Sequence, residues 1–437
     1  MSTAKPEAMV GLPASLGWRG AVANLRLEPT HSRIMAGSVI MLVGSGVVSA
    51  FNFGYTVAVA RLLGPAAFGH ASAAVTLLML LSAITLAFQL VCAKFVARNV
   101  TAGGKAAVYQ SLRRHAWMVG IVLAAAMALG SSQIAQYLNL PSAWMVVLLA
   151  CGIAFYIPLG VKRGGLQGTC AFSRLTSNFI LETVVKFGLA LALVFAGYGV
   201  MGAVGAITAS VIVAYYLPPM GKQLDAAAEP AIPASFREGM QAIVFFVGQV
   251  IINNIDILLV KHFFSPQDAG LYAAVALVGR VLYFSSWQVV SAMFPISASS
   301  KADTRRGGSV LVVPLLLVVA ISLGFIFLLS LFPGLIVRFV FGAGFIQAES
   351  LLSLYAAATG CYALSVVLMS YEISRKIANT GWLQLAFSGA LVLGISLFHA
   401  TLKQVVMVQV VLMVLLLILV SLPFFKDQYE AAREAAA

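Results

Sequence analysis

The sequence predicts an all-α, polytopic membrane protein of about 12 transmembrane helices, in two six-helix lobes that are related by a parallel repeat and enclose a central cleft. Three observations predict this fold: the scarcity of charge, the succession of long apolar segments, and the uneven distribution of Lys and Arg. The 437 residues are 61% hydrophobic and only 9% charged, whereas a soluble domain carries about 25% charged residues. So little charge suits a surface that faces lipid.

Apolar segments follow one another along the chain with short gaps between them. Each is long enough to cross a bilayer as a helix, which takes about 20 residues. Gly44, Pro158 and Pro314 lie inside such segments and do not argue against helix, because membrane helices tolerate Gly and Pro. The predicted spans are residues 36–60, 68–92, 115–137, 143–161, 177–197, 199–218, 239–261, 269–294, 309–332, 350–371, 380–399 and 404–424.

The positive charge of the chain is distributed unevenly between the two sides of the predicted membrane. The net charge is +13, which we interpret as a topology signal rather than a nucleic-acid site. If the N-terminus lies inside the cell, the opposite side receives only four of the 27 Lys and Arg residues, and two more, Lys186 and Arg280, fall within spans. Basic residues favour the cytoplasmic side, so both termini are expected in the cytoplasm. The four on the opposite side are Arg61, Lys261, Arg338 and Lys403.

An internal repeat divides the chain into halves. At one constant offset Asn52 matches Asn253, Pro65 matches Pro266, Gly69 matches Gly270 and Ala73 matches Ala274. Both copies start from the cytoplasmic side, so the repeat is parallel, as in carriers whose two lobes enclose a cleft at mid-membrane. The predicted organisation is an N-terminal tail (1–34), an N-terminal lobe (35–218), a cytoplasmic linker (219–238), a C-terminal lobe (239–425) and a C-terminal tail (426–437).

Polar side chains in the first and seventh spans are candidates for the wall of this cleft. Gln249, Asn253 and Asp256 recur at i, i+4 and i+7 and would share one helix face. Asn52 lies in the equivalent stripe of the first span. Hydrogen bonding between helices is the alternative explanation of such stripes. The symmetric placement in the repeat favours the cleft.

Arg280 is the candidate phosphate contact. It lies in the eighth span, with Trp287 on roughly the same helix face. A charge at bilayer depth is costly and indicates a protein interior or a wet cavity, and a guanidinium can bind a phosphate through two hydrogen bonds. The alternative is a structural ion pair with Asp256. The two interpretations are compatible if Asp256 holds Arg280 until substrate arrives.

Five further charged or titratable side chains have structural alternatives. Glu182 and Lys186 lie one turn apart in the fifth span, with the acid nearer the N-terminus, the better orientation for a pair. They predict either an ion pair closed within one helix or a pair that couples transport to ions. Arg61, Lys261 and His262 lie at the far ends of the first and seventh spans, where we expect them to reach the membrane interface.

No motif for enzymatic chemistry, a cofactor or a metal ion is recognised in the sequence. It lacks a zinc-protease, phosphate-loop or nucleophile-elbow pattern. The four cysteines, Cys92, Cys151, Cys170 and Cys361, are too widely spaced for a metal-binding motif and are expected to be packing residues. We therefore expect no catalytic residue, no cofactor and no metal site.

The segment NFGYTVAVARLLGPAAFGHASAAVTLL at 52–78 resembles the start of the polysaccharide transporter family. Asp268-Ala269-Gly270-Leu271-Tyr272 and Phe294-Pro295 are similar to later stretches of that family. The family includes the O-antigen and exopolysaccharide flippases of the Wzx type, within the multidrug/oligosaccharidyl-lipid/polysaccharide exporter superfamily. The likeness extends over about residues 35–425.

The resemblance implies two six-helix lobes around a central, often cationic cavity that opens alternately to each face of the bacterial inner membrane. It implies a polyprenyl-pyrophosphate-linked oligosaccharide as substrate, for lipopolysaccharide O-antigen or exopolysaccharide. It also implies coupling to H⁺ or Na⁺ rather than to ATP, with membrane lipids and the polysaccharide polymerase machinery as partners. The predicted cavity holds few cations besides Arg280 and Lys186, which suits a weakly charged or neutral sugar.

Several other functions compete with this interpretation. An ion-coupled exporter of drugs or cations would need an acidic membrane residue, and Asp256 could serve. A peptidoglycan-precursor flippase would usually have more than 12 helices. A membrane sugar polymerase or ligase needs a large external loop, which the chain lacks. A scaffold protein would need no charge inside the membrane, contrary to Asp256 and Arg280.

Overall fold

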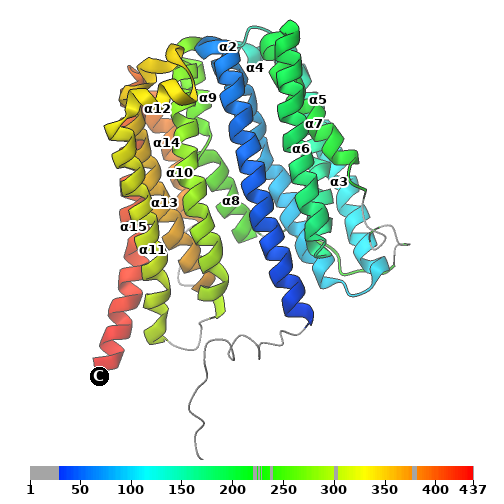
Figure 1. The fold of residues 1–437 in the computed structure, drawn as a ribbon. Coiled ribbons are helices and arrows are strands. Elements are labelled where there is room, and N and C mark those ends of the chain that lie inside the picture. The colour runs from blue at the N-terminus through cyan, green and yellow to red at the C-terminus, as the bar shows by residue number, and fades with distance from the viewer. Residues whose placement is uncertain are drawn as a thin grey trace, which may run out of the picture.

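The computed structural model describes residues 29–219, 224, 227, 229–236, 240–299, 304–375 and 381–436, and regular structure within these residues is helical. The helices form two groups that lie side by side (Figure 1). The first group, the N-lobe, consists of α2 (Pro29–Arg98), α3 (Ala102–Leu129), α4 (Ser131–Tyr137), α5 (Trp144–Gly168), α6 (Phe172–Leu193), the π-helix η1 (Val194–Tyr198) and α7 (Gly199–Tyr216).

The second group, the C-lobe, follows the linker. It consists of α8 (Met240–Ile252), α9 (Ile255–Phe263), α10 (Pro266–Ser299), α11 (Thr304–Leu331), α12 (Pro333–Val340), the 3₁₀ helix η4 (Ala343–Ala348), α13 (Glu349–Arg375), α14 (Gly381–Leu397) and α15 (Leu402–Ala436). The predicted tail at 426–437 is therefore helical as far as Ala436, because α15 continues past its apolar part. Residues 1–28 of the predicted N-terminal tail lie outside the described residues.

The predicted number of spans is confirmed. Nine helices of the described chain are long and apolar enough to cross a membrane. Two of them, Ile40–Arg98 and Phe172–Tyr216, each contain a break and supply two spans, and Gly381–Leu397 is a shorter apolar helix. The 12 helices counted in this way agree with the predicted fold class.

Gly64 separates the first two spans. Its backbone has φ 73° and ψ 175°, a conformation that glycine adopts without a steric penalty. Pro65 follows directly, and proline is favoured at the first position of a helix. One 70-residue helical run is thus divided at the short Gly-Pro turn that the sequence indicates.

The third span begins earlier than its hydropathy predicts. The predicted span starts at residue 115, whereas α3 starts at Ala102, where the Thr101 hydroxyl accepts a hydrogen bond from the Gly104 amide (3.0 Å). Such a cap stabilises a helix start. The charged turns of α3 therefore continue the helix beyond its apolar part.

Part of the linker packs on the N-lobe. The Glu229 amide donates to the Gly103 carbonyl (3.3 Å), and the Ile232 amide donates to Asn99 Oδ1 (3.0 Å). The Phe236 ring meets the Phe88 ring edge-on at 5.2 Å. The second half of the linker is thereby attached to the ends of α2 and α3.

Contact between the lobes is made mainly by α2, which touches α8, α9, α10 and η4. The start of α2 and the end of α15 lie at one end of the bundle, which we call the terminal face, at the bottom of Figure 1. Helices α4 and α12 and the Gly64 kink lie at the other end, the opposite face. The sequence predicts that the terminal face is cytoplasmic.

Candidate functional site

At the opposite face the two lobes meet at a pair of repeat-related glycines. A Cβ on Gly69 would lie 2.9 Å from the Gly270 amide nitrogen and would collide with the Pro266 carbonyl. A Cβ on Gly270 would collide with the Pro65 carbonyl. Close approach of helix backbones in membranes depends on such small residues. The Pro and Gly positions that recur in both halves, Pro65 with Gly69 and Pro266 with Gly270, therefore bring α2 and α10 into backbone contact.

Arg61 joins the lobes beside this contact. Its guanidinium donates to the Val340 carbonyl (2.8 Å) and to the Phe339 carbonyl, at the C-terminal end of α12. A cation is favourable there because the last carbonyls of a helix carry negative partial charge. Arg61 is exposed at the end of its span, and the carbonyls of α12 give it a partner from the other lobe as well.

Lys261 and His262 join α9 to the loop after α4. Lys261 is 0% exposed and its Nζ donates to the Asn139 carbonyl (3.1 Å), while Asn139 Nδ2 donates to the His262 carbonyl (3.0 Å). The His262 ring stacks on the Tyr137 ring at 3.9 Å. The interfacial role expected for Lys261 is wrong, because its side chain is buried between the lobes. His262 is partly exposed and also contacts the N-lobe. We call these contacts, with Arg61–α12 and Gly69–Gly270, the opposite-face junction.

A small pocket lies between the lobes next to this junction. Tyr55, Thr56 and Ser72 of α2 line it from the N-lobe, and Ile257 of α9 and Arg280 of α10 line it from the C-lobe. Its volume of about 30 Å³ leaves room for one or two water molecules. The lobes are therefore packed closely at this level, with the Arg280 side chain at the boundary.

Lys186 and Asn52 form the polar centre of the N-lobe. Lys186 Nζ donates a hydrogen bond to Asn52 Oδ1. The same ammonium lies 5.1 Å from the centre of the Tyr55 ring, within the range of a cation–π interaction. Tyr55 in turn lines the pocket between the lobes. The cation thus lies one side chain away from the inter-lobe boundary.

Glu182 pairs with a different cation from the one that its helix spacing indicates. The carboxylate forms an ion pair with Arg163 of α5, and Asn178 Oδ1 accepts a hydrogen bond from Arg163 Nε (2.8 Å). The Arg163 guanidinium also lies 4.0 Å from the centre of the Phe179 ring. The predicted Glu182–Lys186 pair is not formed, because a buried arginine on the neighbouring helix binds Glu182 and Asn52 binds Lys186.

Asp256 is the most enclosed acid of the predicted site. It lies in the first turn of α9, 1% exposed. Its Oδ2 accepts hydrogen bonds from Tyr272 (2.9 Å), Tyr355 (3.0 Å) and Gln409 (2.8 Å). Its Oδ1 is buried and has no hydrogen-bond partner among the described residues. Three neutral donors hold one oxygen and leave the other with unused acceptor capacity.

Arg280 does not pair with Asp256. Its guanidinium donates to Asn254 Oδ1 (2.9 Å) and to the Asn253 carbonyl (3.3 Å). These two asparagines separate α8 from α9, so the seventh span is broken at mid-length rather than continuous. Asparagine side chains compete with helical hydrogen bonds, and Asn254 Nδ2 donates back to the Val250 carbonyl (2.7 Å). The polar stripe predicted for one helix face is therefore divided between two helices, with Gln249 on α8 and Asp256 on α9.

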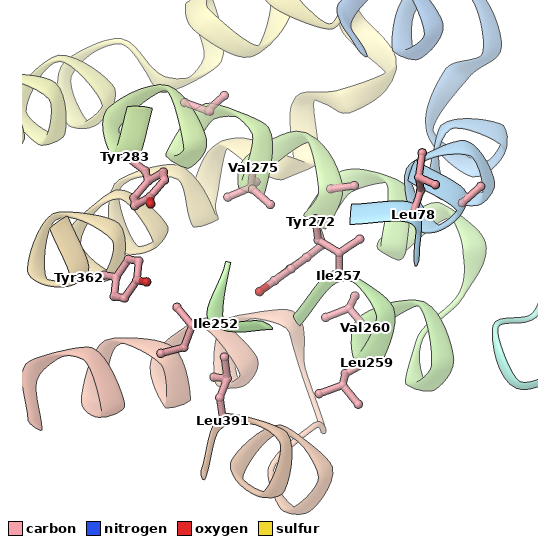
Figure 2. Packing of buried hydrophobic residues seen from close by; sticks show 14 of the residues in the cluster. Leu78, Ile252, Ile257, Leu259, Val260, Tyr272, Val275, Tyr283, Tyr362 and Leu391 are labelled. Carbon is pink, nitrogen blue, oxygen red and sulfur yellow. The ribbon is translucent and has the colours of Figure 1, made fainter. Parts of the chain in front are cut away.

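Gln249 and Trp287 belong to an aromatic cluster inside the C-lobe. Gln249 Nε2 donates to the Tyr283 hydroxyl, and the Tyr283 ring stacks with those of Trp287 (6.3 Å) and Tyr362 (5.8 Å). Figure 2 shows the hydroxyls of Tyr272, Tyr283 and Tyr362 pointing into the lobe interior near Ile252. The interior of the C-lobe thus contains polar side chains. The N-lobe has the Arg163–Glu182 ion pair instead.

Several residues of this arrangement carry no signal in the sequence. Tyr355 and Gln409 reach Asp256 from helices far along the chain, and no spacing connects them. Asn254 could have been found, since two consecutive asparagines in an apolar span indicate a helix break. In the described part of the chain no group of three or more His, Cys, Asp or Glu side chains could hold a metal ion.

Comparison with known proteins identifies the family. The family described as "polysaccharide biosynthesis protein" matches residues 58–350, which is more than half of the chain. The chain belongs to this family. The match confirms the resemblance indicated by residues 52–78. No curated protein sequence matches this family member significantly.

Solved structures share the fold of this polysaccharide biosynthesis protein. A multidrug resistance MATE family transporter of the MOP superfamily, in its inward-facing conformation, superposes with a TM-score of 0.73 at 12% identity, over 89% of this chain and 96% of that one. An outward-facing conformation of a multidrug resistance MATE family transporter of the MOP superfamily gives a TM-score of 0.58 at 14% identity, over 93% of this chain and 96% of that one. A MOP superfamily transporter from Pyrococcus furiosus, described as having a binding pocket of reverse polarity, gives 0.58 at 15% identity, over 92% and 95%. The chain is thus a multi-pass membrane protein with the MOP transporter fold.

Proposed function

We propose that this protein is a flippase that moves polyprenyl-pyrophosphate-linked oligosaccharide across the bacterial inner membrane during O-antigen or exopolysaccharide synthesis. The family match to polysaccharide biosynthesis is the observation that carries the proposal, because it selects this class of cargo among carriers of the same fold. Arg280 at the inter-lobe boundary, with Lys186 next to Tyr55, suits a phosphate-bearing lipid.

Transport follows from alternating exposure of the space between the lobes. The opposite-face junction closes one side through the Gly69–Gly270 contact and the bonds of Arg61 and Lys261. The higher TM-score with the inward-facing relative supports a state that opens toward the terminal face. In the proposed cycle the lipid-linked sugar enters from the terminal face, and the junction opens to release it.

Arg280 is the proposed pyrophosphate contact, with Lys186 on the other lobe. Both are half-buried and both are bound to asparagine oxygens in this state. Hydrogen bonds from a guanidinium to neutral oxygens are weaker than those to phosphate. An arriving pyrophosphate can therefore replace Asn254 as the partner of Arg280. Asn52, Gln249, Asn253 and Trp287 would line the path of the sugar and lipid.

Asp256 is the proposed ion-coupling residue. A carboxylate with one buried, unpartnered oxygen can take a proton or contribute to a Na⁺ site. Binding of either would change the charge inside the C-lobe next to the α8–α9 break. The Arg163–Glu182 pair of the N-lobe is already neutral and would stay so, which assigns it a structural role.

The alternative is an ion-coupled exporter of drugs or cations with the same fold. Asp256 is the observation that favours it, since a buried acid can bind a cationic substrate directly. The family match, Arg280 at the inter-lobe boundary and Lys186 next to Tyr55 favour the flippase. A membrane sugar polymerase or ligase is the least favoured function.

Deletion of the gene in its native host separates the two functions. The flippase predicts accumulation of polyprenyl-linked oligosaccharide on the cytoplasmic leaflet and loss of surface polysaccharide, both restored by the wild-type gene. The glycan of the accumulated lipid would identify the substrate. Unchanged lipid-linked sugars together with increased sensitivity to toxic cations would contradict the flippase and favour the exporter.

A further inference from the structure

A groove separate from the inter-lobe pocket lies on the N-lobe, between α3 and α7. Gln110, Arg113, Arg114 and Trp117 line it from α3, and Tyr215 and Tyr216 line it from α7. Its volume is about 640 Å³. Figure 1 places α3 at the side of the N-lobe away from the C-lobe. The groove shares no lining residue with the pocket that contains Arg280.

The groove changes from cationic to apolar along α3. The two arginines lie nearer the terminal face, where α3 begins, and Trp117 follows one turn further on. Met118 and Ile121 complete the lining and are 50% and 56% exposed. Spacings of three, four and seven residues place these side chains on one helix face. A phosphate, a glycerol backbone and an acyl chain follow one another in the same order in a phospholipid.

The aromatic wall of the groove is held in place by its own contacts. Trp117 Nε1 donates to the Tyr215 hydroxyl (3.1 Å), and the two rings meet edge-on at 5.3 Å. Phe155 of α5 packs edge-on against Trp117 at 5.1 Å. Tryptophan and tyrosine favour the level of the lipid headgroups, where one end of the side chain is apolar and the other is wet.

The charge of the groove is not neutralised by the described part of the protein. Both arginines are exposed, and neither lies within ion-pair distance of a described carboxylate. The Arg113 guanidinium lies over the Tyr109 ring, 5.5 Å from its centre, within the range of a cation–π interaction. Two adjacent guanidinium groups offer donors in the fork geometry that matches phosphate oxygens.

We propose that this groove binds one anionic phospholipid from the leaflet at the terminal face. Arg113 and Arg114 bind the lipid phosphate, Trp117 and Tyr215 lie beside the glycerol, and one acyl chain follows Met118 and Ile121. Basic pockets between membrane helices on the cytoplasmic side recognise acidic headgroups by this chemistry. The site is independent of the substrate carried between the lobes.

The test measures lipid binding to the purified full-length protein by native mass spectrometry, with phosphatidylglycerol and phosphatidylcholine as probes. The wild type should bind one phosphatidylglycerol more tightly than phosphatidylcholine. R113Q/R114Q should weaken this binding about 30-fold, from the loss of two interfacial cations. K105Q/R174Q removes the same charge from α3 and α6 outside the groove and should change the affinity less than about threefold.

A second variant tests the groove rather than the charge. I121W keeps both arginines and fills the apolar end, so it should also weaken phosphatidylglycerol binding, with an unchanged unfolding temperature. Inorganic phosphate at millimolar concentration should not displace the lipid. The proposal is overturned if R113Q/R114Q binds like the wild type, if K105Q/R174Q loses as much affinity, if I121W has no effect, or if phosphate alone displaces the lipid.

Discussion

Tyr55 of the N-lobe and Asp256 of the C-lobe occupy equivalent positions in the repeat, three residues after Asn52 and Asn253. The Tyr55 hydroxyl donates to the Ala203 carbonyl (3.2 Å), a neutral bond within its own lobe. Asp256 carries a carboxylate with three neutral donors on one oxygen and none on the other. At the opposite-face junction, by contrast, Gly69 and Gly270 retain the same role. The repeat is therefore preserved where the lobes touch and diverges where each lobe encloses its polar groups.

This difference indicates that the buried acids of the two halves have different roles. The acid of the N-lobe, Glu182, is neutralised by Arg163 and serves the packing of α5 and α6. Asp256, one of several acids of the C-lobe, has no ion-pair partner among the described residues, and it is the group that we propose exchanges an ion. The following variants compare the two halves directly.

The largest expected effect is on transport and comes from Asp256→Asn. The amide cannot carry the charge that ion coupling needs, so surface polysaccharide should fall to the level of the deletion strain. The loss of folding free energy should be about 1–3 kcal/mol, because hydrogen bonds to Tyr272 and Gln409 are weakened. Tyr55→Phe at the equivalent N-lobe position should retain transport. Normal polymer from Asp256→Asn at normal membrane abundance would refute the assignment.

The next effect is on stability and comes from Arg163→Gln. Removing one partner of a buried ion pair costs about 3–5 kcal/mol, because the other charge is left uncompensated. The unfolding temperature of the purified protein and its abundance in the membrane should both fall. Arg163→Gln/Glu182→Gln should recover part of the loss. If the double variant is no more stable than the single one, the pair is not the reason for the loss.

The Arg163–Glu182 pair could not be predicted from the sequence, because helix spacing reports only neighbours on the same helix. The i, i+4 pattern places Lys186 beside Glu182, but the fold brings Arg163 from another helix against the same carboxylate. The twelve spans and the repeat were predictable, because hydropathy and turns that contain Pro and Gly are local signals. The partners of Asp256 were not, because Tyr355 and Gln409 approach it only through the packing of α13 and α15. Arg280 was identified by its charge, whereas its partner Asn254 was missed.

A smaller effect is expected at the opposite-face junction. In Gly270→Ala the added methyl group would meet the Pro65 carbonyl, and overpacking of this kind costs about 1–3 kcal/mol. The cost falls on the state in which the junction is closed, so cysteine probes near Tyr137 should become more accessible to soluble reagents. Gly389→Ala, where a Cβ meets nothing within 4 Å, is the matched control. Equal accessibility in both variants would contradict a closing role for Gly270.

The smallest effect is expected from Arg280→Ala. Loss of one phosphate contact should reduce flipping about tenfold, which corresponds to about 1.4 kcal/mol. Membrane abundance should remain normal, since the described partners of Arg280, Asn253 and Asn254, are neutral. Lys186→Ala should have a similar but weaker effect if both lobes contact the pyrophosphate. Wild-type surface polymer in Arg280→Ala, measured at equal protein abundance, would remove Arg280 from the substrate path.

The central claim is that the opposite-face junction must open during each transport cycle. The most direct test introduces Tyr137→Cys and His262→Cys, whose native rings are 3.9 Å apart, after replacement of Cys92, Cys151, Cys170 and Cys361. A short, reducible thiol cross-linker should stop the delivery of lipid-linked oligosaccharide to the far leaflet, and reduction should restore it. Each single-cysteine variant should be unaffected by the reagent. Undiminished delivery by the fully cross-linked protein would contradict the account.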